Sequence, residues 1–127
     1  MNVMDVVEQL EKAREGFREL DMEVAKVVGW RRSTRAVTDA ATNATKIESV
    51  WINPASEKPG RVPRYTTNIQ SAYELVQQLV PSSVGAVKWD ENGGSAWMDL
   101  KGEPVFAATP ALALCAATLR VYGGTTS

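Results

Sequence analysis

Residues 109–120 read TPALALCAATLR, and the expected fold depends on this stretch. Thr109 is a favourable N-cap and Pro110 suits the first helical position, so together they predict the start of a helix. The residues that follow are apolar on nearly every side, which is typical of a helix buried on several sides. We expect this helix to run to about Leu119. Gly123, which follows shortly after, is suited to its C-terminal end.

Three further helices are predicted from apolar residues that recur at helical spacing. The first covers residues 4–15 and the second covers residues 18–28, with Gly29 after its end. The third begins after Thr67 or Asn68, which are both good N-caps, and ends before Pro81.

Strands are expected between these helices. KIESVWIN at residues 46–53 is rich in β-branched and aromatic residues, and SVGAVKWD-ENGG-SAWMDLKG reads as a β-hairpin. In the expected register Trp89 lies opposite Ala96, which turns Trp97 away from the apolar face and places it beside Lys88. A turn at Lys101-Gly102 leads to a third strand, EPVFAA.

Two stretches are expected to be loops. RRSTRAVTDAATNAT at residues 31–45 has few large apolar residues and no clear period, and ASEKPGRVPR at residues 55–64 is rich in Pro and Gly. Adjacent strands favour an α+β fold, here a helix–sheet–helix sandwich with a mostly antiparallel sheet. We expect a single domain over residues 1–127 with an irregular basic insert at about 31–64.

Composition limits the chemistry. The 127 residues include no histidine and one cysteine, Cys115. These counts exclude Ser-His-Asp and Cys-His catalysis, histidine-ligated metals and a cysteine zinc cluster. We therefore expect a protein that is not an enzyme and uses no metal or cofactor. Without an apolar run of membrane-spanning length or a signal peptide, we expect a cytoplasmic location and no membrane partner.

Charge is unevenly distributed along the chain. Residues 31–64 contain seven bases and three acids, whereas the segments on either side are acidic and the whole chain has a net charge of −1. A local basic segment indicates a surface that faces an anion. Genomic nucleic acid is not an expected partner, because it needs a broader basic excess.

Arginine and aromatic side chains supply the candidate ligand-binding residues. Guanidinium groups hold phosphates through forked hydrogen bonds, and a flat ring can stack on a base. The alternatives stay open: the arginines could be solvated, Trp97 could be covered by a helix, and Arg120 could complement a helix end. The candidates are Arg31, Arg35, Arg61, Arg64, Tyr65, Trp97 and Arg120.

The chain also resembles a known family. FRELDMEVAKVVGW at residues 17–30 and FAATPALALCAATLR at residues 106–120 are similar to the phage ABA sandwich domain family of small phage-encoded proteins. YTTNIQSAYELV at residues 65–76 and the hairpin with its tryptophans fit the same order of elements. The resemblance implies a helix–sheet–helix sandwich and a phage origin, and it implies no chemistry.

A more distant likeness, in size and layout, is to the phage anti-defence sponges that sequester nucleotide signals. We therefore expect a homo-oligomer in the host bacterial cytoplasm that holds a cyclic nucleotide or cyclic ADP-ribose type immune signal between protomers without degrading it. The alternative is a protein–protein interaction module that acts on a host protein or as a virion accessory.

Overall fold

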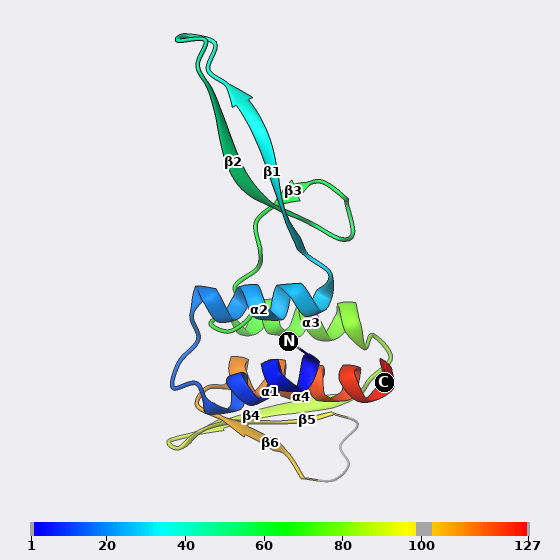
Figure 1. The fold of residues 1–127 in the computed structure, drawn as a ribbon. Coiled ribbons are helices and arrows are strands. Elements are labelled where there is room, and N and C mark those ends of the chain that lie inside the picture. Colours follow the sequence, from blue (N-terminus) through cyan, green and yellow to red (C-terminus); the bar gives the residue numbers. More distant parts are fainter. Residues whose placement is uncertain (1, 99–102, 127) are drawn as a thin grey trace.

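The computed structural model describes residues 2–98 and 103–126, which form a layered body with a projecting arm (Figure 1). The helices are α1 (Val3–Lys12), α2 (Arg18–Val28), α3 (Ile69–Leu79) and α4 (Pro110–Thr126). The strands are β1 (Arg31–Thr38), β2 (Thr45–Ile52), β3 (Pro59–Gly60), β4 (Gly85–Asp90), β5 (Gly93–Met98) and β6 (Val105–Ala107). None of the described helices is both long enough and apolar enough to cross a bilayer.

The strands form two antiparallel sheets, in the orders β1-β2-β3 and β4-β5-β6. The α+β class with antiparallel sheets is therefore confirmed. α4 packs on β4–β6 and also contacts α1 and α3. Figure 1 shows both helical layers, α1 with α4 and α2 with α3, on the same side of β4–β6, so the layers run sheet, helix, helix instead of helix, sheet, helix.

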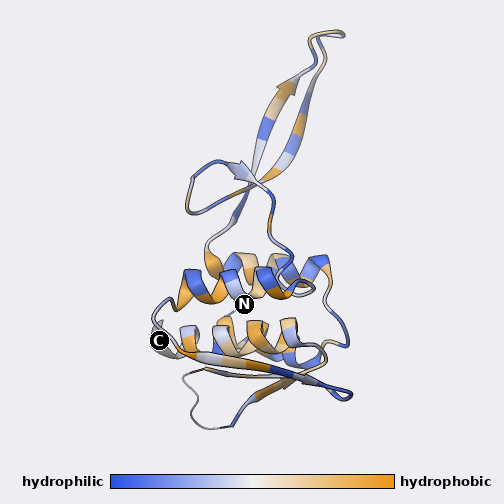
Figure 2. Cartoon of the chain, turned by 180° about the vertical axis from the view of Figure 1, so that it is seen from behind, coloured by the Kyte–Doolittle hydropathy of each residue, from blue (hydrophilic) through white to orange (hydrophobic). Residues whose placement is uncertain are grey.

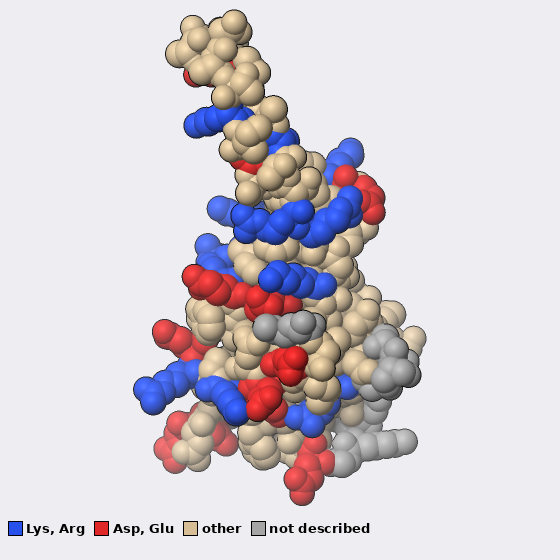
Figure 3. Space-filling model, viewed as in Figure 1, with Lys and Arg blue, Asp and Glu red and all other residues tan. Residues whose placement is uncertain are grey.

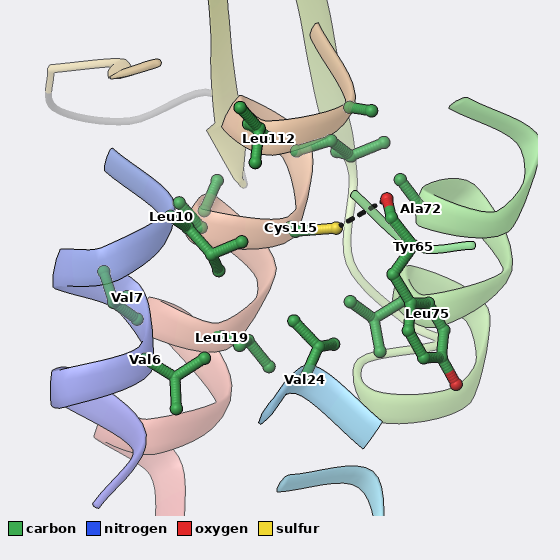
Figure 4. Packing of buried hydrophobic residues seen from close by; sticks show 14 of the residues in the cluster. Val6, Val7, Leu10, Val24, Tyr65, Ala72, Leu75, Leu112, Cys115 and Leu119 are labelled. Carbon is green, nitrogen blue, oxygen red and sulfur yellow. Dashed lines mark hydrogen bonds between the residues drawn. The ribbon is translucent and has the colours of Figure 1, made fainter. Parts of the chain in front are cut away.

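The core is centred on α4, as its composition predicts. Every residue from Ala111 to Leu119 is buried. Figure 2 shows hydrophobic residues along the helices, and in Figure 4 side chains of the other helices, such as Leu10, Val24 and Leu75, lie around this segment. The helix continues to Thr126 instead of ending near Leu119. Gly123 lies inside it, where a Cβ atom would stand 3.0 Å from Val3 Cγ1, so a missing side chain lets α4 approach α1.

The other helix boundaries follow local signals. The bounds of α2 are those predicted, and Gly29 after it has the left-handed φ of 118°. Asn68 caps α3 by accepting a hydrogen bond from the Ser71 N–H at 3.0 Å. α1 is shorter than expected, because it ends at Lys12, and it begins with a capping box between Asn2 and Asp5.

The expectation of a loop at residues 31–45 is wrong. Most of this stretch is β1, which pairs with β2 residue for residue from Arg31 opposite Ile52 to Thr38 opposite Thr45. The hairpin projects from the body as an arm (Figure 1), and all residues of β1 except Val37 are exposed. A strand that is exposed on both faces needs no alternation of apolar and polar residues, so the sequence pattern carries no strand signal.

The same turn closes both ends of β2. In the first turn the Asp39 N–H donates to the Ala44 carbonyl at 2.8 Å, and Asn43 has a φ of 59°. In the second turn the Asn53 N–H donates to the Lys58 carbonyl at 2.9 Å, and Glu57 has a φ of 58°. The Asp39 and Asn53 side chains each accept from the N–H two residues later, at 2.8 and 2.9 Å. The predicted loop at 55–64 thus contains the short strand β3.

The second hairpin has a different register and a shorter connection than expected. Trp89 lies opposite Gly94 and not opposite Ala96, so the connection is two residues and not four. The reason is close packing: a Cβ atom on Gly94 would stand 2.5 Å from the Pro110 nitrogen, so this glycine belongs to the strand under α4. The shift of two preserves the faces, and Trp97 still shares a face with Lys88. The expected turn at Lys101-Gly102 lies outside the described residues.

A buried carboxylate ties the chain that leaves the arm to α2. Asp21 is fully buried, and its Oδ1 accepts hydrogen bonds from the Thr66 N–H at 2.8 Å and from the Thr66 hydroxyl at 2.6 Å. Arg18 Nη1 pairs with Asp21 Oδ2 at 2.8 Å, while Arg18 Nη2 donates to the Val62 carbonyl at 2.9 Å. A buried charge needs such compensation, and here backbone, hydroxyl and guanidinium all provide it.

We predict that Asp21→Ala lowers the free energy of unfolding by about 3 kcal/mol, because it leaves the Thr66 amide unpaired in the core. Urea unfolding followed by circular dichroism measures the change. Glu23→Ala is the matched control, since Glu23 lies on the same helix and pairs with exposed Lys26 at 3.1 Å. Its expected cost is below about 1 kcal/mol. Equal losses in the two variants would contradict the anchoring role of Asp21.

Candidate binding site at the base of the arm

Sheet pairing gathers arginines that are far apart in the sequence. Arg32 lies opposite Trp51, which in turn lies opposite Gly60, and Arg61 follows directly. Figure 3 shows the Lys and Arg side chains concentrated where the arm meets the helical layers, with most acidic side chains below. We call the set Arg31, Arg32, Arg61 and Arg64 the basic neck; all four are exposed.

Two tryptophans, Trp30 and Trp51, lie at the base of the arm. The Arg32 guanidinium lies 5.2 Å from the centroid of the Trp51 ring, a cation–π arrangement, and Trp51 is half-buried. Trp30 is only 6% exposed, and a Cβ atom on Gly60 would stand 3.5 Å from its ring. Trp30 therefore acts as a packing anchor under the sheet, while Trp51 and Arg32 face outward.

The arginines differ in how strongly they are held. Arg31 pairs with Glu57 at 2.9 Å, and both side chains are more than half exposed. Exposed pairs of this kind contribute about 0–1 kcal/mol, so an incoming anion can displace the carboxylate. In the part of the chain that the structure describes, Arg61 and Arg64 form no ion pair. Their guanidinium groups are available to an anion.

Arg35 is a candidate that lies apart from the neck. It stands farther along the arm, four residues beyond Arg31 on the same face of β1. Its guanidinium pairs with Glu48 of β2 at 2.8 Å. This is a cross-strand contact that stabilises the arm, so we do not count Arg35 in the site.

Tyr65 is the clearest departure from expectation. It was a candidate for stacking on a ligand, but its ring is 2% exposed and belongs to the core (Figure 4). Its carbonyl accepts a hydrogen bond from the Cys115 thiol at 3.2 Å. Burial raises the pKa of Tyr65 to about 12, opposed in part by a hydrogen bond with Trp30. Burial likewise raises the pKa of the Cys115 thiol, so it is an inert core group.

Trp97 faces away from the helices, as predicted. Lys88 Nζ lies 6.0 Å from its ring centroid. It belongs to β5, however, and this sheet lies on the opposite side of the body from the arm (Figure 1). In one protomer, Trp97 and the neck arginines therefore cannot line a common pocket.

Arg120 is also separate from the neck. Its Nη2 pairs with Glu11 Oε1 at 2.7 Å, which joins α4 to α1. Because α4 continues past this position, Arg120 is not a helix-end residue either. The contact has a structural explanation, so Arg120 has no assigned role in binding.

Five cavities among the described residues lie away from the neck. None of these five is lined by a neck arginine or by Trp97. One of about 530 Å³ lies between α1 and α2, lined by Val6, Lys26 and Tyr122 among others. No cluster of acidic or cysteine side chains in the described ranges is suited to a metal ion. In a single protomer all four neck arginines are exposed.

The contact between Arg32 and Trp51 is the feature of the site that was not predicted from the sequence. Their contact depends on pairing between β1 and β2, and that pairing was not expected. A signal is nevertheless present: Asp39 and Asn43 are turn-forming residues that separate two stretches of equal length. Interpreting them as a hairpin turn would have placed Arg32 opposite Trp51.

Comparison with known proteins adds no relative. No protein-family model matches the chain, and neither a curated protein nor a solved structure is significantly similar to it. The resemblance to the phage ABA sandwich domain family therefore stays a prediction.

The burial of Tyr65 predicts a pH effect on stability. The unfolded chain releases the phenol proton near pH 10, whereas the folded protein keeps it to a pH of about 12. Ionisation thus stabilises the unfolded state first, so the free energy of unfolding falls as the pH rises between these values. Tyr65→Phe lacks this group and should lose less stability over the same range in urea titrations. Identical slopes for the two proteins would show that Tyr65 is accessible to solvent.

Proposed function

We propose that this protein is a non-catalytic binding protein that holds a small nucleotide-derived anion at the basic neck. The observation that supports the proposal is the Arg32 guanidinium over the half-buried Trp51 ring, with exposed Arg61 directly after Gly60, the strand partner of Trp51. Forked hydrogen bonds to phosphate contribute about 1.5–3 kcal/mol each, which allows two of them to give useful affinity. If the chain is of phage origin, sequestering a host immune signal is the role that fits such binding.

The proposed site differs from the one expected from sequence. Arg31, Arg61 and Arg64 remain in it, and Arg32 with Trp51 replaces Tyr65 and Trp97 as the element that meets a base. An open surface buries little of a small ligand, and pockets that bind such molecules cover most of their surface. For tight binding, the proposal therefore includes a second protomer that closes the site, as in the homo-oligomer expected from the sequence.

Titration calorimetry against cyclic dinucleotides, cyclic mononucleotides and cyclic ADP-ribose isomers tests the proposal. We expect one ligand class to bind, and we expect Arg32→Gln and Arg64→Gln each to weaken it about tenfold or more, the loss of one charge-assisted hydrogen bond. Lys88→Gln is the matched control, because Lys88 forms the other cation–π pair, far from the neck. Its affinity should equal that of the unmodified protein.

Two outcomes would contradict the proposal. One is the absence of heat with every member of the panel. The other is equal weakening by Lys88→Gln and Arg32→Gln, which would remove the site from the neck. Recovery of the ligand unchanged after denaturation separates sequestration from enzymatic degradation.

A second candidate is a protein–protein interaction module. The observation that favours it is that the neck arginines line none of the five cavities and lie on an open surface next to a projecting arm. An acidic protein surface could cover them without any enclosed pocket. Affinity capture separates the two: a stoichiometric protein retained by the unmodified chain and lost with the charge reversal Arg61→Glu, Arg64→Glu favours this candidate.

A further inference from the structure

The arm has backbone edges that nothing in the described chain covers. β1 lies at the edge of its sheet, and β2 is covered by β3 only at Trp51 and Ile52. Residues 45–50 of β2 therefore present unpaired N–H and C=O groups on the side away from β1. A free edge of this kind is a template on which another strand can pair.

Charge selects which edge can meet a second copy of the chain. β1 contains Arg31, Arg32 and Arg35 and no acidic residue, so two copies of it would repel each other. β2 contains one residue of each sign, Lys46 and Glu48. Two copies of β2 can meet without a net charge.

We propose that two copies of this protein pair through β2, antiparallel, about a two-fold axis at Ile47. In this register Lys46 lies opposite the second copy's Glu48, and Thr45 lies opposite its Ser49. The pairing gives two cross-strand contacts of opposite charge and joins the arms into one sheet of order β1-β2-β2-β1. A two-fold arrangement of this kind is the commonest form of homodimer.

The alternative registers are worse. When two copies of β2 pair about a two-fold axis perpendicular to the sheet, residues that lie opposite each other project from the same face. This condition requires that the axis pass through a residue, so the neighbouring registers have the axis at Lys46 or at Glu48. Moving the axis to Lys46 sets two lysines opposite each other, and moving it to Glu48 sets two glutamates opposite each other. Like charges directly opposite destabilise a sheet, so the axis at Ile47 is preferred.

Burial supports the same axis. Ile47 is 69% exposed, and Ala36 of β1 lies directly opposite it and is exposed as well. Pairing at Ile47 joins the two copies of this pair into a continuous apolar stripe across four strands. The pairing would thus bury part of the exposed Ile47 side chain against Ile47 of the second copy.

The free edge of β2 is also long enough for the pairing about Ile47. Pairing about Ile47 extends from residue 44 to residue 50, and β3 begins to occupy the edge at Trp51. The tip of the second copy's arm then lies beside β3 and supplies a second wall for the basic neck. Only this last consequence rests on the proposed function; the pairing itself involves no ligand.

Disulfide trapping tests the pairing directly. Residues opposite each other in antiparallel strands have Cα atoms about 4.5–5.5 Å apart, within the range that a disulfide spans. Ile47→Cys should therefore form a covalent dimer under mild oxidation on a non-reducing gel. Ala36→Cys is the matched control, since three strand spacings, about 14 Å, separate it from its copy. The native Cys115 is buried and does not compete.

Trapping that is absent, or equally fast at the two positions, would overturn the proposal. Sedimentation without ligand gives an independent readout: the unmodified chain should be a dimer, and Ile47→Asp should raise its dissociation constant at least tenfold. Thr34→Asp, on exposed β1, should leave it unchanged. Circular dichroism checks that each variant is folded. A monomer at every concentration would reject the pairing even if the neck binds a ligand.

Discussion

The arrangement of arm and body depends on the buried contact between Asp21 and Thr66. A carboxylate without solvent contact is costly unless hydrogen bonds and a counterion compensate for its charge. Here the amide and hydroxyl of Thr66, from the chain that descends from β3, donate to one oxygen, and Arg18 of α2 itself pairs with the other. A segment without helix or strand is thereby fixed to α2, and Asn68 can begin α3 directly after it.

The same contact explains why the basic neck has a defined position. The arm joins the body at two points: Trp30, which follows the left-handed Gly29, and the residues that Asp21 and Arg18 hold. Gly16 completes the second junction, because a Cβ atom there would stand 2.1 Å from the Thr66 carbonyl oxygen. With both junctions fixed, β3 and Arg61 stay beside Trp51. Beyond them the arm projects away from the helical layers (Figure 1).

Sequence patterns predicted the body better than the arm. α2 and α4 carry strong local signals, namely apolar spacing and caps, and both formed, although α4 continues to Thr126 instead of ending near Leu119. In the arm only β2, which is rich in β-branched residues, formed close to where a strand was expected. β1 lacks such signals because neither of its faces is buried, and its polar residues resemble those of a loop. The burial of the Tyr65 side chain could not be predicted from neighbouring residues either, since an aromatic residue after a basic loop can face either the core or solvent. Its burial follows from tertiary packing, in which the Tyr65 ring lies beside Leu75 of α3 (Figure 4).

Of the candidate site, the sequence could predict the arginines but not their neighbours. A cross-strand contact such as Arg32 with Trp51 exists only once two strands are known to pair. Separation of Trp97 from the neck follows from the order of layers, because both helical layers stand between β4–β6 and the arm (Figure 1). Charge composition shows that a basic surface exists, whereas topology decides which rings accompany it.

Hydrogen exchange of the Thr66 amide tests the central role of the Asp21 contact most directly. Thr66 lies outside the helices and strands, yet its N–H donates to a buried carboxylate. The structure predicts that this amide exchanges only through global unfolding, as slowly as the amides in the middle of α4. Exchange at the rate of an exposed loop amide would contradict the claim that this contact holds the arm to the body.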